Sequence, residues 1–220
     1  MPFFFAERDG DRAVVRGADA EHLARSLRVR VGEEIQLVDP TGFLLTVKVE
    51  AVGRGVVEGR VLAALEHRPE PERHVVVAIA HLPAATLDLV LSRCTEVGAS
   101  GFVIVEAERS VARGARVERW QAIVREAAML AGRLRVPSVE GPSTLDDVLR
   151  SRRGCVMLVP GAKLALRDLP HSDEVTLLIG PEGGWTEREL GVGPVHASLG
   201  PRNLRADTAA IVATAIAVGV

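Results

Sequence analysis

Residues 178–185 read LIGPEGGW and residues 198–208 read SLGPRNLRADT, and these two stretches set the architecture of the chain. The first stretch completes the apolar run 175–179, which is typical of a strand buried in a parallel sheet. The three glycines and the proline that follow predict a tight loop whose backbone can approach a ligand closely. Thr186 and Glu189 have the spacing of a capping box, so a helix should begin directly after this loop. Such loops at the carboxyl ends of strands are where open α/β sheets bind ligands.

The second stretch leads into residues 206–218, an almost entirely apolar segment that predicts a buried C-terminal helix. Gly200-Pro201 predicts a turn, and Asp207 would lie in the first helical turn, where a carboxylate complements the helix dipole. Arg205 has two interpretations: it contacts a substrate, or it forms an ion pair with Asp207 or Glu182. Neither stretch contains a P-loop or a Gly-x-Gly-x-x-Gly string, so the two common phosphate-binding devices are not predicted.

The two halves of the chain differ in their hydrophobic patterns. From His74 onward strands and helices alternate, which predicts an α/β domain with helices on both faces of a mostly parallel sheet. The expected strands are 75–80, 102–105, 155–159 and 175–179, and the expected helices are 87–97, 117–131, 145–149 and 206–218. The first 65 or so residues are mostly β and predict a small barrel. Its expected strands are 14–16, 34–38, 43–52 and 56–65, with one helix at 20–27. The polar segment 66–72, which contains two prolines, is the predicted linker.

Composition restricts the classes of function. The 220 residues are 47% hydrophobic and 25% charged, as in an ordinary folded protein, and only 3% are aromatic. So few aromatic residues argue against a reader of single-stranded RNA that stacks bases on aromatic rings. The formal net charge of −2 gives no sign of a nucleic-acid partner. A local excess of arginine between 109 and 135 is either a solvated face or a phosphate-binding surface.

Targeting and redox signals are few. Cys94 and Cys155 have no metal-ligand spacing, so we expect no metal site and two buried free thiols in a reducing compartment. The N-terminal residues MPFFFAERDG lack the features of a signal peptide, and no apolar run is long enough to span a membrane. The sequence therefore predicts a cytoplasmic protein without a membrane partner.

The order and spacing of five motifs resemble one family along nearly the whole chain. The motifs are HLARSLRVRVGEEIQLVD (22–39), SRCTEVGASGFVIVEAERSV (92–111), RWQAIVREAAMLAGRLRVPSVEGP (119–142), GPEGG (180–184) and LGPRNLRADTA (199–209). They are similar to those of the bacterial methyltransferases that modify the N3 ring nitrogen of a uridine in small-subunit (16S) ribosomal RNA. These enzymes belong to the SPOUT superfamily.

The resemblance implies both a fold and a cofactor. Residues 1–68 would form a PUA-like RNA-binding β-barrel, and residues 74–220 an α/β methyltransferase domain with a trefoil knot. Three loops at the knot would bind S-adenosyl-L-methionine in a bent shape. The residues expected to contact this cofactor are Val159, Pro160, Leu178, Ile179, Gly180, Pro181, Glu182, Gly183, Gly184, Ser198, Leu199, Gly200, Asn203 and Leu204.

The resemblance also implies catalytic and RNA-binding roles. Methyl transfer from a sulfonium requires an aligned nucleophile and no metal. Arg205 would stabilise the anion that develops on the uridine, and Glu182 would orient the loop or the target base. The arginines expected to hold ribosomal RNA of the small subunit are Arg28, Arg30, Arg109, Arg113 and Arg133. The apolar C-terminal helix would form a homodimer interface, unless its own domain covers it completely.

Several positions depart from the family pattern. Trp185 replaces the usual phenylalanine, and Asn203 stands where an aliphatic residue is usual. The usual lysine is missing from 81–85, and segment 128–133 is altered. Two other functions stay open: a SPOUT methyltransferase for another RNA position, such as a ribose hydroxyl, and a non-catalytic RNA-binding ribosome-assembly factor.

Overall fold

The computed structural model describes residues 2–192 and 194–219, and its chain divides into two compact units. The first contains Met1–Glu70 and Ala128–Arg135, and the second contains Pro71–Ala127 and Val136–Val220. Residues 128–135, which we assigned by sequence to the second domain, thus belong to the first unit. The domain limits 1–68 and 74–220 stay a proposal.

Local contacts explain why the short segment 128–135 belongs to the first unit. The side chain of Met129 packs in the core of that unit, and its carbonyl oxygen accepts a 2.9 Å hydrogen bond from the backbone N–H of Phe3. The imidazole Nε2 of His67 donates to the carbonyl oxygen of Gly132 over 2.6 Å. Sequence periodicity could not show these contacts, because they join residues more than 60 positions apart.

The first unit is built on a mixed six-stranded sheet with the order β1-β4-β5-β6-β3-β2. Its strands are β1 (Phe4–Phe5), β2 (Glu7–Asp9), β3 (Arg12–Arg16), β4 (Glu34–Asp39), β5 (Phe43–Gly53) and β6 (Val56–Glu66). The β1–β4 pair is parallel and the other pairs are antiparallel. Only Ala6 separates β1 from β2, although they lie at opposite ends of the order. The sheet must therefore curl, which gives the PUA-like shape that the sequence predicted.

One helical segment and one turn complete the first unit. Helix α1 (Gly17–Glu21) continues as a π-helical turn, η1 (His22–Ser26). The predicted turn after β4 is confirmed: the carboxylate of Asp39 accepts hydrogen bonds from the backbone N–H and the hydroxyl of Thr41, at 2.9 and 2.7 Å.

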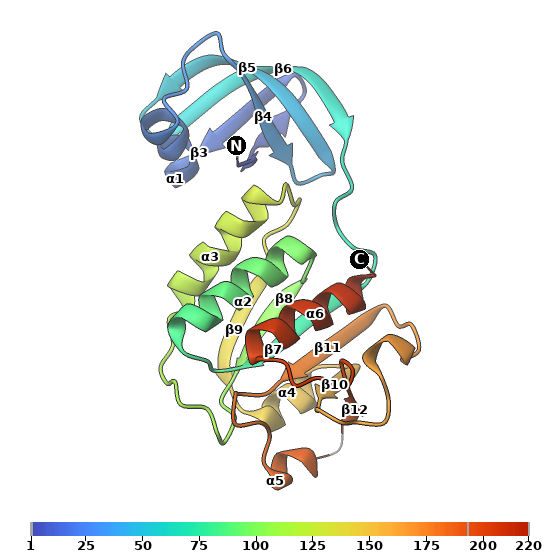
Figure 1. The fold of residues 1–220 in the computed structure, drawn as a ribbon. Coiled ribbons are helices and arrows are strands. Elements are labelled where there is room, and N and C mark those ends of the chain that lie inside the picture. The colour runs from blue at the N-terminus through green and yellow to red at the C-terminus, as the bar shows by residue number, and fades with distance from the viewer. Residues whose placement is uncertain (1, 193, 220) are drawn as a thin grey trace. The chain divides into compact units, whose positions relative to one another are not determined.

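The second unit contains a six-stranded, entirely parallel sheet with the order β12-β10-β11-β7-β8-β9 (Figure 1). Its strands are β7 (His74–Ala80), β8 (Gly101–Val105), β9 (Ser138–Ser143), β10 (Cys155–Leu158), β11 (Glu174–Ile179) and β12 (Val195–Ala197). Its helices are α2 (Ala84–Val97), α3 (Val117–Leu130), α4 (Leu145–Ser151), the 3₁₀ turn η2 (Leu166–Asp168), α5 (Glu187–Leu190) and α6 (Ala206–Val218). The last residues of α3, from Ala128, are counted with the first unit.

Burial in this sheet follows the sequence pattern. All five residues of β8 and residues 75–80 of β7 are buried, as expected for strands covered on both faces. Helices α2 and α6 pack against each other, and α6 also contacts β7 and β11 (Figure 1). Helix α2 ends at Gly98, whose φ of 120° is a conformation that favours glycine, so the predicted C-cap is confirmed. The predicted trefoil knot stays a prediction.

Several sequence expectations differ from the structure. Strand β9 was not expected, because its sequence SVEGPS carries glycine and proline and has no apolar run. Of the two thiols expected to be buried, Cys94 is buried, whereas Cys155 at the start of β10 is partly exposed. Among the described residues, no helix combines the length and the apolar character needed to cross a membrane. No group of three or more His, Cys, Asp or Glu in residues 2–192 and 194–219 is arranged to hold a metal ion.

Candidate active site

Three adjacent strands create the candidate site. Strands β12, β10 and β11 are neighbours and parallel, so the loops after them leave the sheet at the same edge. These loops enclose a pocket of about 570 Å³, a volume typical of small-molecule sites. Its lining residues are Leu158, Val159, Pro160, Ile179, Gly180, Pro181, Glu182, Gly183, Gly184, Trp185, Leu190, Leu199, Gly200, Arg202, Asn203, Leu204, Arg205, Ala206 and Ala209.

The pocket brings together every residue that we expected to contact the cofactor except Leu178 and Ser198. Leu178 is fully buried in the core of the second unit. Ser198 is held by backbone hydrogen bonds: its N–H donates to the carbonyl oxygen of Leu164, and its own carbonyl oxygen accepts from Leu166. Neither residue lines the pocket, and their contact with the cofactor stays a prediction.

Sequence reasoning missed six lining residues. They are Leu158, Trp185, Leu190, Arg202, Ala206 and Ala209. Two signals could have indicated some of them. Trp185 directly follows the glycine loop, and Ala206 and Ala209 are three positions apart in the first turn of α6, so they share a helix face.

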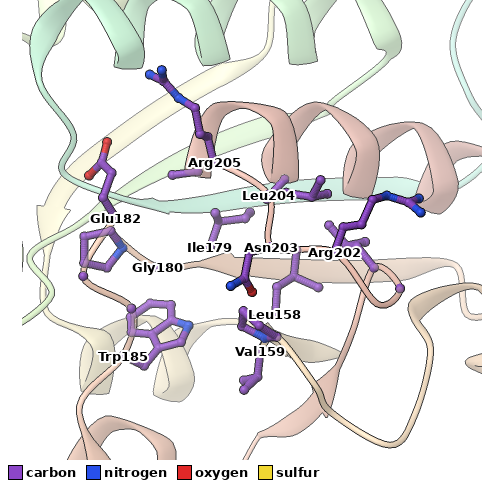
Figure 2. A pocket seen from close by; sticks show the side chains of 18 of the residues that line it. Leu158, Val159, Ile179, Gly180, Glu182, Trp185, Arg202, Asn203, Leu204 and Arg205 are labelled. Carbon is purple, nitrogen blue, oxygen red and sulfur yellow. The ribbon is translucent and has the colours of Figure 1, made fainter.

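Trp185 packs across the floor of the glycine loop. A Cβ atom on Gly180 would lie 3.1 Å from both Nε1 and Cε2 of the indole, so a larger residue would press against this ring. The Trp185 side chain is 7% exposed, and its buried Nε1 has no hydrogen-bond partner in the described part of the chain. Figure 2 shows the indole edge that carries Nε1 turned toward the side on which Asn203 and Val159 lie.

Arg205 and Glu182 lie toward one side of the pocket, and Trp185 and Val159 toward the opposite side (Figure 2). The Arg205 side chain is 73% exposed, and its Nε is 3.6 Å from Oδ1 of Asp207. That oxygen also accepts from the backbone N–H and the hydroxyl of Thr208. The ion pair with Asp207 therefore exists, but it is long and the Arg205 side chain is exposed, so the guanidinium stays available at the pocket.

Arg109 contacts the glycine loop. Its Nη1 donates to the carbonyl oxygens of Gly183 and Trp185, at 2.7 and 3.3 Å. The residue before Arg109 makes a second hydrogen bond to this region: the backbone N–H of Glu108 donates to the buried carboxylate of Glu189 over 2.9 Å. The Glu189 side chain also completes the predicted capping box with Thr186, which is confirmed. Arg109 thus holds the pocket loop, a role that sequence reasoning missed when it assigned this residue to RNA.

The remaining arginines expected to bind RNA lie in different places. Arg28 and Arg30 are exposed on either side of buried Val29 in the first unit, and Arg113 is exposed in the second. Arg133 is only 4% exposed, and its Nε donates to the carboxylate of Glu70 over 3.2 Å. A buried guanidinium bound in this way forms a structural ion pair, and its contact with RNA stays a prediction.

The segment that lacks the family's lysine begins with a buried histidine. His81 follows β7, is 6% exposed, and packs edge-on against Trp120 with ring centroids 5.7 Å apart. Its Nδ1 has no hydrogen-bond partner among the described residues. Burial lowers the pKa of His81; nearby Glu106 raises this pKa, and Arg113 and Arg116 lower it.

Comparisons with known proteins agree with this two-part organisation. Residues 68–218 match the family model described as an RNA methyltransferase domain, and residues 15–62 match the RNA methyltransferase PUA domain. The chain is 38% identical over 231 residues to a ribosomal RNA small subunit methyltransferase E of Mycobacterium bovis, with 96% of this chain and 87% of the relative covered. It is 32% identical over 217 residues to one from Synechocystis, with 90% and 70% covered.

A solved structure extends the comparison to the fold. The Neisseria gonorrhoeae ribosomal RNA small subunit methyltransferase E, bound to S-adenosyl methionine, superposes with a TM-score of 0.86 at 28% identity, covering 98% of this chain and 95% of that one. The fold, the pocket and the domain matches define a SPOUT-type RNA methyltransferase with a PUA domain. Within that class, the chain belongs to the ribosomal RNA small subunit methyltransferase E family.

Proposed function

We propose that this protein transfers a methyl group from S-adenosyl-L-methionine to the N3 atom of a uridine in small-subunit ribosomal RNA. The observation that carries this proposal is the pocket in which the loops after β10, β11 and β12 meet. It unites twelve of the fourteen predicted cofactor residues, Glu182 among them, with Arg205 in a chain of this family. The solved relative that binds S-adenosyl methionine adds support.

The residues of the pocket suit this cofactor. Leu158, Ile179 and Leu199 offer apolar walls of the kind that surround a nucleobase, while the glycine loop offers backbone groups. Trp185 adds a buried donor that has no partner among residues 2–192 and 194–219. When bound, S-adenosyl-L-methionine supplies a methyl group on a sulfonium.

Arg205 is the first candidate for the electrostatic role in this reaction. The N3 atom of uridine carries a proton at neutral pH and becomes a good nucleophile only when that proton leaves. The exposed guanidinium of Arg205 would then stabilise the negative charge on the neighbouring carbonyl oxygens. Glu182, exposed on the glycine loop, would orient that loop or the target base.

The test uses labelled S-adenosyl-L-methionine, undermodified small ribosomal subunits and mapping of the modified nucleotide. We expect Arg205→Ala to abolish turnover and to leave cofactor affinity nearly intact, because the side chain points out of the apolar part of the pocket. Arg153→Ala is the matched control, since Arg153 is exposed just before the amino end of β10, the end away from the pocket. Unchanged turnover of Arg205→Ala would refute its role. A wild-type protein that fails to bind the cofactor in calorimetry would favour a non-catalytic RNA-binding factor.

The RNA partner would be held by exposed arginines of both units. Arg28 and Arg30 in the PUA-like unit and Arg113 in the catalytic unit have the exposure that phosphate contacts require. Such contacts make the logarithm of the binding constant fall linearly with the logarithm of salt concentration, so a flat slope would exclude them. A protein that acts on the small ribosomal subunit would work in the cytoplasm.

We also propose a homodimer formed through α6. One side of this helix, which includes Ala210, Ala213 and Ala217, is buried within the unit. Val212 and Ala215 on another side are only half-buried, although they are apolar. A second copy would remove this apolar surface from water. A monomer in light scattering at micromolar concentration would refute the dimer.

A further inference from the structure

The indole N–H of Trp185 is a buried hydrogen-bond donor in the wall of the pocket. The side chain is 7% exposed, and no oxygen or nitrogen in the described part of the chain accepts from Nε1. Buried polar groups in proteins are nearly always hydrogen-bonded, and each exception calls for an explanation. Because Trp185 lines the pocket, a ligand bound there can supply the missing acceptor.

The surroundings of Trp185 indicate which part of a ligand lies there. The indole packs on the bare Cα of Gly180, and its Nε1 edge is turned toward the pocket side that holds Val159 and Asn203 (Figure 2). The charged side chains of Glu182 and Arg205 lie toward the other side. A largely apolar wall whose polar groups, the Trp185 N–H and the Asn203 amide, are uncharged suits a flat heterocycle or sugar that carries acceptor atoms better than it suits a charged amino-acid group.

We propose that the Nε1–H of Trp185 donates a hydrogen bond to an acceptor in the adenosine half of the bound cofactor. The acceptor is a ring nitrogen of adenine or an oxygen of ribose, since these are the neutral acceptors in that half. Trp185 thereby becomes a residue that determines cofactor affinity. The phenylalanine usual in this family cannot make the bond, because it has no N–H. This inference rests on the proposed cofactor role of the pocket.

Calorimetry on the wild-type chain and on Trp185→Phe tests the proposal, because phenylalanine keeps an aromatic ring at this position while it removes the N–H donor together with the second ring. We expect the variant to bind S-adenosylhomocysteine about five- to tenfold more weakly, the range of one hydrogen bond. The same loss should appear with 5′-methylthioadenosine, which lacks the amino-acid group. The melting temperature of the ligand-free variant should fall only by the packing that the smaller ring loses; a lower value with unchanged affinity would show a purely structural role and overturn the proposal.

A spectroscopic readout tests the bond without mutation. The chain has only two tryptophans, so the ¹⁵N-labelled protein gives two indole N–H signals, and Trp185→Phe identifies the one from Trp185. On addition of S-adenosylhomocysteine, we expect the Trp185 signal to shift and its hydrogen exchange to slow, while the Trp120 signal changes little.

The possible failures are distinguishable. If the wild type binds the ligand and Trp185→Phe binds it equally well, the inference is overturned and the cofactor role stands. If the wild type binds neither S-adenosylhomocysteine nor S-adenosyl-L-methionine, the cofactor role fails and the inference with it. If Asn203→Leu loses the same affinity and adding Trp185→Phe causes no further loss, Asn203 is the acceptor in the bound state, which also overturns the inference.

Discussion

The guanidinium Nη1 of Arg109 donates a 2.7 Å hydrogen bond to the carbonyl oxygen of Gly183, a residue 74 positions further along the chain. Arg109 follows β8 and Gly183 follows β11, and these strands are separated in the sheet by β7. The bond therefore ties the glycine loop to a segment from beyond the neighbouring strand. A loop that must present its backbone to a ligand gains affinity from being held in shape before binding.

Removal of this tie should weaken cofactor binding. We expect Arg109→Ala to raise the dissociation constant for S-adenosylhomocysteine about fivefold, because one charge-assisted but exposed hydrogen bond is lost. Arg113→Ala is the matched control, since Arg113 is an exposed arginine whose side chain donates to the adjacent carbonyl oxygen of Ala112. Titration calorimetry measures both variants. Equal affinity in the two would mean that the loop keeps its shape without Arg109.

Glu189 gives a second prediction, for stability. Its buried carboxylate accepts hydrogen bonds from the backbone N–H groups of Glu108 and Thr186, at 2.9 and 2.8 Å, so both oxygens are used. In Glu189→Gln an amide NH₂ would face one of these donors, and we expect the free energy of unfolding to fall by about 1–3 kcal/mol. Urea denaturation measures this loss. Glu187→Gln, an exposed change in the same helix, should stay within about 0.5 kcal/mol of the wild type.

The capping box shows how far the sequence could predict this site. Thr186 and Glu189 interact within one helical turn, so their spacing alone predicted the contact. The partner of Glu189 across the sheet, Glu108, is 81 positions away and follows no local rule. The glycine loop was predicted in the same way, from neighbouring residues. Its contact with Arg109 was not predicted, because Arg109 lies far away in the sequence.

In the fold, too, features set by the local sequence were predicted, and features set by contacts between distant residues were not. Continuous apolar runs such as β7 and β11 predicted buried parallel strands, since covering a sheet on both faces requires such composition. Strand β9 has no apolar run and was missed, because backbone pairing with β8 rather than side-chain periodicity defines it. The assignment of residues 128–135 to the first unit also depends on distant contacts, such as that of Arg133 with Glu70.

Arg133 should therefore matter for stability and leave RNA binding nearly unchanged. Its guanidinium pairs with Glu70, whose carboxylate also accepts from the backbone N–H of Leu134 over 2.9 Å. Arg133→Ala leaves Glu70 without its countercharge, so we expect a loss of about 3 kcal/mol in the free energy of unfolding. The salt dependence of RNA binding, measured under conditions where the variant stays folded, should match that of the wild type.

The exposed pair in the first unit is the matched comparison for Arg133. Arg28→Ala with Arg30→Ala should reduce the slope of the log binding constant against log salt by about 1 to 2, as expected for one or two lost phosphate contacts. A reduced slope in Arg133→Ala instead would restore its RNA-binding role.

His81 predicts a pH dependence of stability. Burial lowers the pKa of His81 from its ordinary value of 6.5, and the opposing effect of Glu106 is smaller. Below pH 6.5 the unfolded chain therefore takes up a proton that the folded chain does not, so His81 makes the folded state lose stability as the pH falls toward its lowered pKa. His81→Phe keeps a ring against Trp120 and removes the titration. We expect the free energy of unfolding to fall less in the variant than in the wild type between about pH 7 and about pH 5.5. Denaturant titrations at both pH values give the fall in the free energy of unfolding for the wild type and for the variant. The other five histidines contribute equally to both falls, so the comparison isolates His81. An equal decrease in both proteins would show that His81 accepts its proton as readily when folded as when unfolded.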